Sequence, residues 1–441
     1  MLDLVTPRDE RYALSRTQFI GRPVEVLPRA VARCGSAGEV VEALAFARSR
    51  GLPFAIRGGG HSNACHSSTS GLLVDVTPAD RITVADGLVT VGGGVRIGRL
   101  ARALAPLGRL VPTGSCPSVG VVGAALGGGF GSHGRLHGLT CDALVGAEVV
   151  LADGRVVGTA GEPDLLWALR GAGGGLGVVT SATFRTVAAL PRTHFRLEWG
   201  FEHAAALVAW WQRWAPGAPD GVSAELVLLG PQYPEEPPVA LLIGAAPDRA
   251  AVQAFADDFG RPAVAEIADL SAADAALLHA TPYSAVAHDP SEIPLVHDRP
   301  GLSTATTGFF ARPLPDDAVA ALLAHFTADR VMGELREVAF TPWGGGYART
   351  PGDATAFGHR DPAFLVKHTV LVGPGGAARR GEVVLARARA GRDLLRPWGT
   401  GGAYVNFPEP GLPDHAYHGA NAARVRAVKA HYDPGGAFRP G

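Results

Sequence analysis

The stretch Arg57-Gly58-Gly59-Gly60-His61-Ser62 places a histidine directly after three consecutive glycines. A second stretch, Pro112-Thr113-Gly114-Ser115-Cys116-Pro117-Ser118-Val119-Gly120, carries a cysteine in a turn-rich loop. Because glycine has no Cβ, such loops turn sharply and press their backbone amides against an anion such as a pyrophosphate. Imidazole and thiolate are the two side chains best able to bond covalently to an electrophilic flavin ring. The two stretches therefore predict a flavin held at two points, His61 and Cys116.

Further motifs follow these loops in order along the chain. They are Gly127-Gly128-Gly129-Phe130-Gly131, Gly138-Leu139-Thr140-Cys141-Asp142, Val149-Val150-Leu151-Ala152-Asp153-Gly154, Asp164-Leu165-Leu166-Trp167-Ala168-Leu169-Arg170-Gly171 and Tyr404-Val405-Asn406. A single glycine run is compatible with an ordinary surface turn, whereas several motifs in order are not. With the two loops, they make the chain resemble the vanillyl-alcohol-oxidase superfamily, in particular its berberine-bridge-enzyme-like branch.

The resemblance implies an FAD bonded through His61 to its 8α-methyl group and through Cys116 to its C6 atom. It also implies a larger set of cofactor-binding residues, namely Arg57, Gly58, Gly59, Gly60, Ser62, Gly114, Val119, Gly120, Gly123, Gly127, Gly128, Gly131, Gly138, Asp142, Gly177, Val178, Tyr404 and Asn406. His66 is a weaker candidate than His61, because no glycine run precedes it. The other three cysteines, Cys34, Cys65 and Cys141, are expected to be buried and inert.

Periodicity and the resemblance together predict an α+β fold. A PCMH-type FAD-binding domain is expected over residues 1–188, a substrate domain with an antiparallel sheet backed by helices over 189–395, and a returning segment over 396–441. Helical spacing is found at 38–50, 204–214 and 316–326, and strand patterns at 54–57, 239–243 and 364–372. Asp86-Gly87 and Asp153-Gly154 are typical of hairpin turns.

Composition limits the partners and the compartment. The 441 residues include 40 Lys and Arg against 41 Asp and Glu, so no basic field for nucleic acid is expected. Four unevenly spaced cysteines indicate neither a disulfide framework nor a metal centre. No secretory signal and no membrane span are evident, which favours a cytoplasmic enzyme. The expected partners are a small-molecule substrate and dioxygen, and no feature of the sequence defines an oligomeric state.

Three residues are candidates for the proton chemistry. The family pattern Tyr-x-Asn-Tyr-x-Asp corresponds to residues 404–409, which are Tyr-Val-Asn-Phe-Pro-Glu in this chain. The first tyrosine of the pattern, Tyr404, is therefore retained. In sugar- and alcohol-oxidising relatives this tyrosine contacts the substrate hydroxyl, although it could also simply pack beside the flavin. A second tyrosine of the family is replaced by Trp343, which precedes three glycines. His368 lies in an alternating strand and is expected either to face the flavin as an acid or base or to be structural.

The predicted activity is hydride transfer from an alcohol, either a sugar or a natural-product hydroxyl, to flavin N5, followed by transfer of electrons to dioxygen to give hydrogen peroxide. An amine substrate is a further option, and a role in bacterial secondary metabolism is expected. Val119 is expected to leave room for dioxygen beside the flavin. Two alternatives remain. The stretch 129–134 formally matches the G-x-G-x-x-G motif of NAD(P)-dependent Rossmann enzymes, with Asp153 about 20 residues further on. A flavin carrier without turnover is the other.

Overall fold

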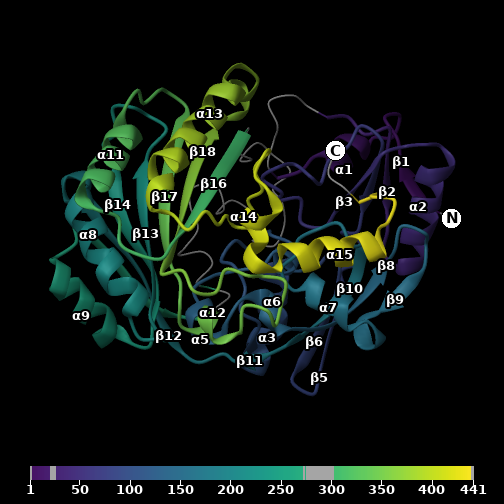
Figure 1. Cartoon of the computed structure of the whole chain (residues 1–441), viewed down its shortest axis with the longest axis horizontal. Helices are drawn as coiled ribbons and strands as arrows, with labels where there is room; N and C mark the ends of the chain where they lie inside the picture. Colours follow the sequence, from purple (N-terminus) through teal and green to yellow (C-terminus); the bar gives the residue numbers. More distant parts are fainter. Residues whose placement is uncertain (1, 20–25, 272–273, 275–301, 439–441) are drawn as a thin grey trace.

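The protein is described by a computed structural model that places residues 2–19, 26–271, 274 and 302–438. Figure 1 shows two regions side by side, one built from small sheets and short helices and the other from one large sheet with helices on its outer side. The chain passes from the first region to the second between residues 188 and 192 and returns after residue 395. The expected α+β class is confirmed.

The first region begins with a four-stranded sheet. In spatial order its strands are β1 (Asp3–Val5), β2 (Ala30–Arg33), β4 (Leu72–Asp75) and β3 (Phe54–Arg57). Helix α2 (Ala37–Ser49) packs its buried alanines and leucine against this sheet, and Ser36 caps it by accepting a hydrogen bond from Glu39 N at 3.4 Å. The glycine loop with His61 therefore leaves the end of β3, a strand fixed in the sheet by its parallel pairing with β4.

A five-stranded sheet completes the first region. Its strands are β5 (Ile82–Ala85), β6 (Leu88–Gly92), β10 (Val178–Arg185), β8 (Leu144–Val150) and β9 (Val156–Gly158), and beside it β7 (Arg109–Leu110) pairs with β11 (Val187–Ala188). The expected hairpin turn at Asp86 and Gly87 is confirmed, since both residues have positive φ, 51° and 75°. The short helices here are α1 (Tyr12–Arg16), α3 (Ile97–Leu104), α4 (Val121–Leu126), α5 (Gly134–His137), α6 (Thr140–Ala143) and α7 (Pro163–Leu169).

The stretch 129–134 does not sit in a Rossmann setting. It lies between the two short helices α4 and α5, and α5 has only four residues. A dinucleotide fingerprint requires a strand before the glycines and a long helix after them. Asp153 lies in the turn between β8 and β9, where its carboxylate pairs with Arg155 at 2.7 Å. Neither half of the dinucleotide motif is therefore formed.

The second region is one antiparallel seven-stranded sheet. In spatial order its strands are β15 (Val264–Leu270), β12 (Arg192–Gly200), β14 (Val239–Ala246), β13 (Ser223–Gly230), β17 (Glu334–Pro342), β18 (Phe364–Val372) and β16 (Leu302–Phe310). The expected strands at 239–243 and 364–372 are confirmed within it.

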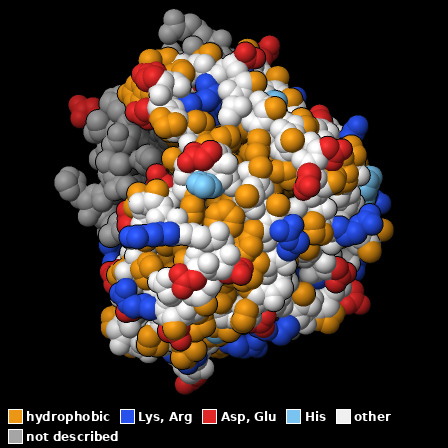
Figure 2. Space-filling view, turned by 90° about the vertical axis from the view of Figure 1, so that its left-hand side faces the viewer, with side chains coloured by type: hydrophobic (Ala, Val, Ile, Leu, Met, Phe, Trp, Pro, Cys, Tyr) orange, Lys and Arg blue, Asp and Glu red, His pale blue; other side chains and the backbone are white. Residues whose placement is uncertain are grey.

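Helices cover the outer face of this sheet, while its inner face is turned toward the first region (Figure 1). They are α8 (Ala204–Trp214), α9 (Arg249–Phe259), α11 (Asp316–Thr327) and α13 (Pro374–Leu395). Alternate strand residues such as Leu197, Leu242 and Val366 form one core with Trp211 and Leu322 of the helices. The exposed surface of the helix layer mixes hydrophobic with charged side chains (Figure 2).

The two regions are joined through Arg135 and through the C-terminal segment. The buried Arg135 guanidinium donates hydrogen bonds to the carbonyls of Val222 and Pro216 at 3.0 and 3.1 Å, and also to those of Ala218 and Trp343. Helix α12 (Gly346–Arg349) contacts α5 across the same junction. Helices α14 (Asp414–His418) and α15 (Ala422–Tyr432) then return along the first region, where α15 contacts α7 (Figure 1).

Candidate functional site

The two loops that carry His61 and Cys116 pack backbone against backbone. A Cβ on Gly59 would lie only 2.2 Å from the Gly120 nitrogen, so no side chain fits at that position. Gly60 has a φ of 71°, a left-handed conformation that glycine adopts without strain. The glycines thus bring together two segments that are about 60 residues apart in the sequence.

Ser118 connects the two predicted attachment residues. Its Oγ lies 2.9 Å from His61 Nε2 and 3.6 Å from Cys116 Sγ, and the serine is buried. The His61 ring also stacks on Phe19, with ring centroids 4.0 Å apart and an angle of 17° between the planes. With Nε2 engaged by the hydroxyl, the second ring nitrogen, Nδ1, remains for another partner. Only the tertiary structure reveals this link, because nothing in the motif marks Ser118 as different from other loop serines.

Burial sets the protonation of these groups. Desolvation, and to a lesser extent the charge of Arg96, lowers the pKa of His61 to about 3, so the imidazole is neutral at pH 7. Desolvation raises the pKa of Cys116, and hydrogen bonding from Ser118 opposes that shift. Burial raises the pKa of Cys34 to about 12 and also raises that of Cys141. Cys116 is the one cysteine of the four that is not fully buried, as its predicted role requires.

Tyr404 closes over the glycine run 127–131. Its hydroxyl accepts hydrogen bonds from Gly129 N at 2.7 Å and from Asn406 Nδ2 at 3.2 Å, and Asn406 Nδ2 also donates to Ala124 O. A Cβ at Gly127 would lie 2.1 Å from Asn406 Oδ1, and one at Gly128 would lie 3.2 Å from the rings of Tyr404 and Phe357. Burial raises the pKa of Tyr404 well above its usual range, despite these two hydrogen bonds. The phenol is therefore protonated at neutral pH.

Trp343 is buried beside Tyr404, and its indole N–H is hydrogen-bonded within the protein. The indole Nε1 donates to His359 O at 2.9 Å, and the ring stacks on Tyr347 with centroids 4.5 Å apart. Tyr347 supplies a second buried tyrosine that the sequence reading did not single out. Its hydroxyl lies 3.0 Å from Gly131 O and 3.2 Å from Gly131 N. The structure thus places a tyrosine next to the glycine run, four residues after the tryptophan.

His368 does not face the site, contrary to the possibility raised by the strand pattern. On β18, Leu365 packs on the inner face with Tyr404 and Trp343, so the pleat sends position 368 to the outer face. There the His368 ring lies against Gly391 of α13, and burial lowers its pKa to about 3. The strand was read correctly, but which face lies inside depends on the packing of the sheet.

The inner face instead presents a charged group that the sequence reading missed. Lys367 Nζ lies 3.0 Å from Glu337 Oε1 and 5.8 Å from the centre of the Phe407 ring. Glu225, whose pKa is raised by burial, accepts a hydrogen bond from Thr341 at 2.8 Å. The partners come from three neighbouring strands, β13, β17 and β18. We call these residues, Glu225, Glu337, Thr341 and Lys367, the inner-face polar cluster.

The side chains of the remaining predicted cofactor residues mainly contact other groups of the protein. The Arg57 guanidinium donates to carbonyls of residues 15–17 and 67, and Asp142 forms a buried ion pair with Arg360 at 2.7 Å. Ser62 Oγ accepts a hydrogen bond from His66 N. Most of the others are partly buried or buried positions around the loops, namely Gly58, Gly114, Val119, Gly131, Gly138, Gly177 and Val178. Gly123, in contrast, is exposed, and no atom lies within 4 Å of a Cβ built there.

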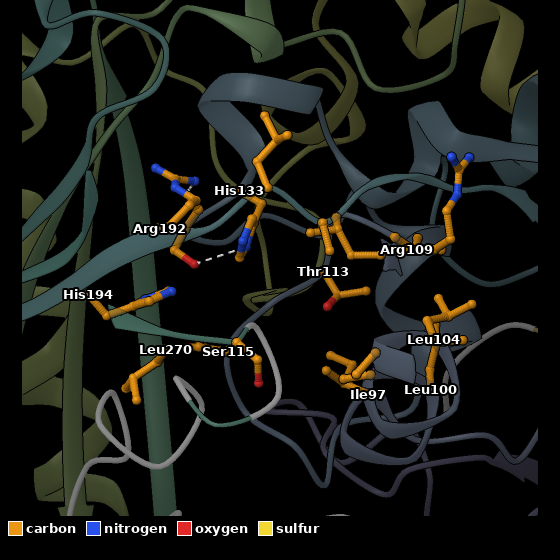
Figure 3. Close-up of a pocket in the computed structure, with 18 of the residues that line it drawn as sticks. Ile97, Leu100, Leu104, Arg109, Thr113, Ser115, His133, Arg192, His194 and Leu270 are labelled. Carbon is orange, nitrogen blue, oxygen red and sulfur yellow. Dashed lines mark hydrogen bonds between the residues drawn. The ribbon is translucent and has the colours of Figure 1, made fainter. Parts of the chain in front are cut away.

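A cavity of about 370 Å³ lies between the two regions, beside the loop that carries Cys116. Figure 3 shows Ile97, Leu100 and Leu104 on one side of it and His133 and His194 on the other. Its lining is completed by loop and strand residues of both regions, including Thr113, Gly114, Ser115, Leu190, Arg192 and Leu270. Cavities of this size at domain interfaces, mostly apolar with a few convergent polar groups, commonly bind small molecules.

Comparisons with known proteins agree with this geometry. Residues 28–160 match the FAD binding domain family, and residues 403–440 match the berberine and berberine-like family. The FAD-linked oxidoreductase YgaK of Bacillus subtilis, itself uncharacterized, is 28% identical over 99% of this chain and 95% of its own length. Chitooligosaccharide oxidase of Gibberella zeae is 28% identical over 93% of this chain and 86% of its own.

Solved structures show the same fold. BBE-like 1 of Physcomitrella patens superposes with a TM-score of 0.85 over 99% of this chain and 96% of its own, at 24% identity. Glucooligosaccharide oxidase of Acremonium strictum, described with a 6-S-cysteinyl, 8α-N1-histidyl FAD, superposes with a TM-score of 0.84 over 99% of this chain and 95% of its own, at 24% identity. Within the described residues, every helix is too short or too polar to cross a membrane.

The residues present fit a flavin. A neutral imidazole and a thiol, joined by Ser118, lie at one end, and glycine loops with closely approaching backbone extend from them. Tyr404 and Asn406 lie at the far side of the 127–131 run. The first region therefore carries the FAD-binding site.

Proposed function

The chain belongs to the FAD-linked oxidoreductases of the berberine-bridge-enzyme-like type, and from this premise we propose that it is an alcohol oxidase whose FAD is bonded to both His61 and Cys116. The observation that carries the proposal is the shared contact with Ser118, which brings imidazole and sulfur to one point. The flavin linkage described for glucooligosaccharide oxidase, through a cysteine and the N1 atom of a histidine, supports the same pairing of residue types. His61 Nδ1 is the ring nitrogen left for such a bond.

FAD, when bound, accepts a hydride from the substrate carbon and passes electrons to dioxygen, with release of hydrogen peroxide. The side chains must hold the alcohol and take its hydroxyl proton. Tyr404 offers a hydroxyl beside the glycine run. Its backbone N donates to the Thr307 hydroxyl at 2.9 Å, and Thr307 pairs with Lys367 of the neighbouring strand. Burial raises the pKa of Tyr404, so the phenol acts as a base more readily as pH rises. We assign proton acceptance to Tyr404.

The cavity between the regions is the proposed site for the body of the substrate. Its lining includes aliphatic side chains from α3 and from residues 190 and 270, with Ser115, His133 and His194 as polar contacts. Sugar-binding subsites commonly use aromatic rings as stacking surfaces. The described lining of this cavity contains no Phe, Tyr or Trp. We therefore propose an alcohol with an apolar body, as in a natural-product scaffold, in preference to a bare oligosaccharide. We further propose a cytoplasmic role in bacterial secondary metabolism.

The attachment is tested by denaturing the purified protein and measuring its intact mass. The parent chain is expected to exceed its own mass by one FAD. His61→Ala and Cys116→Ala should each retain the flavin through the remaining bond, and the double replacement should release it. Loss of all flavin from either single variant under denaturing conditions would contradict two-point attachment.

Turnover is tested by screening alcohols for peroxide release, with apolar-bodied alcohols and oligosaccharides compared at equal concentration. We expect the substrate to reduce the flavin under anaerobic conditions and air to reoxidise it. A flavin that no alcohol bleaches would favour a carrier without turnover. Peroxide from oligosaccharides alone would overturn the proposed substrate class and keep the oxidase assignment.

A further inference from the structure

We propose that Ser118 is the positioning residue that prepares both His61 and Cys116 for bonding to the flavin. This inference rests on the proposed double attachment. It assigns a role to a residue that lies outside the glycine run and is adjacent in sequence to neither His61 nor Cys116. Ser118 is 4% exposed, so water does not compete for its hydroxyl. Its Oγ is 2.9 Å from His61 Nε2 and 3.6 Å from Cys116 Sγ.

The direction of the hydrogen bonds decides which ring nitrogen reacts. A serine hydroxyl donates one proton and accepts through its lone pairs. If Ser118 donates to Cys116 Sγ, it accepts from His61 Nε2–H, and the neutral imidazole then has its free lone pair on Nδ1. If instead the hydroxyl donates to Nε2, the ring proton sits on Nδ1 and blocks it. The chain Nε2–H to Oγ–H to Sγ is therefore the one arrangement of the three groups that favours both nucleophiles.

The surroundings support this arrangement. Because burial keeps the His61 imidazole neutral, the ring carries a single proton, and one acceptor is enough to fix the tautomer. The stacked Phe19 ring restricts rotation of His61 out of the plane. Hydrogen bonding from Ser118 favours the thiolate of Cys116 against the effect of burial. The thiolate is the form of cysteine that acts as a nucleophile.

The two bonds balance with dioxygen as the oxidant. For His61, a bond forms between Nδ1 and the 8α carbon, and one C–H bond of the methyl group breaks. Ser118 Oγ accepts the Nε2 proton as it passes its own hydroxyl proton on to solvent, so the serine is unchanged at the end of the step. For Cys116, a bond forms between Sγ and C6, and the S–H and C6–H bonds break. Each step removes two electrons and two protons, and these reduce one dioxygen to hydrogen peroxide. Double attachment therefore consumes two molecules of dioxygen per chain.

The test measures covalent incorporation and does not depend on turnover. Full-length chain from riboflavin-starved cells is mixed with FAD in air, and flavin that stays with the denatured protein is followed over time by absorbance and intact mass. Ser118→Ala is first compared with the parent. The same replacement is then made in His61→Ala, which can form only the cysteinyl bond, and in Cys116→Ala, which can form only the histidyl bond, and each double variant is compared with its single variant. We expect roughly tenfold slower incorporation in both backgrounds, as for loss of one hydrogen bond to a reacting group. Ser118→Thr, which keeps the hydroxyl, should restore the rate.

Ser67→Ala is the matched control. Ser67 is also buried and lies in the loop that follows His61. Its replacement by alanine removes one hydrogen bond, from Ser67 Oγ to Gln18 Oε1 at 3.0 Å. It should incorporate flavin at the parent rate.

The outcomes separate this inference from the proposed function. If the parent itself releases its flavin on denaturation, the double attachment is wrong. If the parent holds two bonds and Ser118→Ala forms both at the parent rate, the role of Ser118 is wrong and the attachment stands. Slowing in one background alone would overturn the shared role. If Ser118→Ala does not bind FAD at all, Ser118→Thr decides. Covalent incorporation at the parent rate in Ser118→Thr supports the role of the hydroxyl. A Ser118→Thr variant that forms no covalent product overturns it.

Discussion

The flavin side and the substrate side of this protein are built in different ways. The flavin side is formed by glycine loops whose backbones approach closely, as at Gly59 and Gly120. The proposed substrate side includes the inner face of the seven-stranded sheet, where side chains from β13, β17 and β18 form the inner-face polar cluster. Backbone packing leaves a local mark in the sequence, because only glycine fits. A cluster of side chains from separate strands leaves none. Substitutions on the two sides should therefore fail in different ways.

The largest effect is expected at Gly59. In Gly59→Ala the new Cβ would lie 2.2 Å from Gly120 N, which is backbone and cannot move aside cheaply. We expect the two loops to separate, with a loss of stability of about 1–3 kcal/mol and no covalent flavin. The measurement is bound flavin after denaturation together with the thermal midpoint. Gly161→Ala, where no atom lies within 4 Å of the new Cβ, should match the parent. Full flavin content in Gly59→Ala would break the comparison on the flavin side.

A chemical effect without loss of flavin is expected at Tyr404. Tyr404→Phe keeps the ring and deletes the hydroxyl, and a positioned general base contributes roughly 10²- to 10⁴-fold. Flavin reduction by the substrate should slow by that factor in anaerobic stopped flow, with both covalent bonds intact. Because burial raises the pKa of Tyr404, the parent rate should rise with pH over the neutral and alkaline range.

Tyr417→Phe serves as the control, since it deletes a hydroxyl that is bonded to the backbone of Glu409 away from the glycine run. Its rate of flavin reduction should equal that of the parent. A rate for Tyr404→Phe within about threefold of the parent would exclude Tyr404 as the base and direct attention to Lys367.

A smaller effect, confined to substrate binding, is expected in the cavity. Ala101→Trp places a large ring among the aliphatic lining residues of α3. We expect KM for apolar-bodied alcohols to rise about tenfold, which corresponds to about 1.4 kcal/mol. Flavin attachment should not change. Leu107→Trp is the control, because Leu107 is 55% exposed and is not among the lining residues. An equal KM for Ala101→Trp and the parent would place substrate binding outside this cavity.

The smallest effect on flavin binding and reduction is expected on the outer face of the sheet. Desolvation lowers the pKa of His368 to about 3 in the folded protein, against about 6.5 when unfolded. Below pH 6.5 the unfolded chain therefore binds a proton that the folded protein does not, so this residue makes stability fall as pH decreases from 6.5 toward 3. In His368→Gln the free energy of unfolding should fall less steeply, by at most about 1.4 kcal/mol per pH unit.

Denaturant titrations of parent and His368→Gln from pH 7 to pH 4 measure this slope. The rate of flavin reduction at pH 7 should stay the same in the variant, since the ring lies against Gly391 on the face away from the flavin. A reduction rate lowered tenfold would return His368 to the site and contradict the assignment of the two faces.

Much of the fold could be read from the sequence because its signals are local. The strand pattern at 364–372 and the helix spacing at 204–214 each describe one element, and β18 and α8 have these same bounds. The turn at Asp86 and Gly87 follows from residues that tolerate positive φ. Within the candidate site, His61 and Cys116 were found for the same reason, since each directly follows a glycine or turn motif.

The sequence by itself determined that two glycine loops present an imidazole and a sulfur, and that Tyr404 follows them in the family order. The tertiary structure alone decided that Ser118 joins the two nucleophiles, that Lys367 and not its neighbour His368 faces inward, and that Tyr347 lies beside the glycine run. The physical reason is that a strand alternates its side chains with a period of two, so a one-residue choice of face exchanges every inward and outward group. That choice is made by packing on both sides of the sheet: α13 covers the outer face of β18, and residues far away in the sequence, such as Leu139 and Tyr404, pack on its inner face.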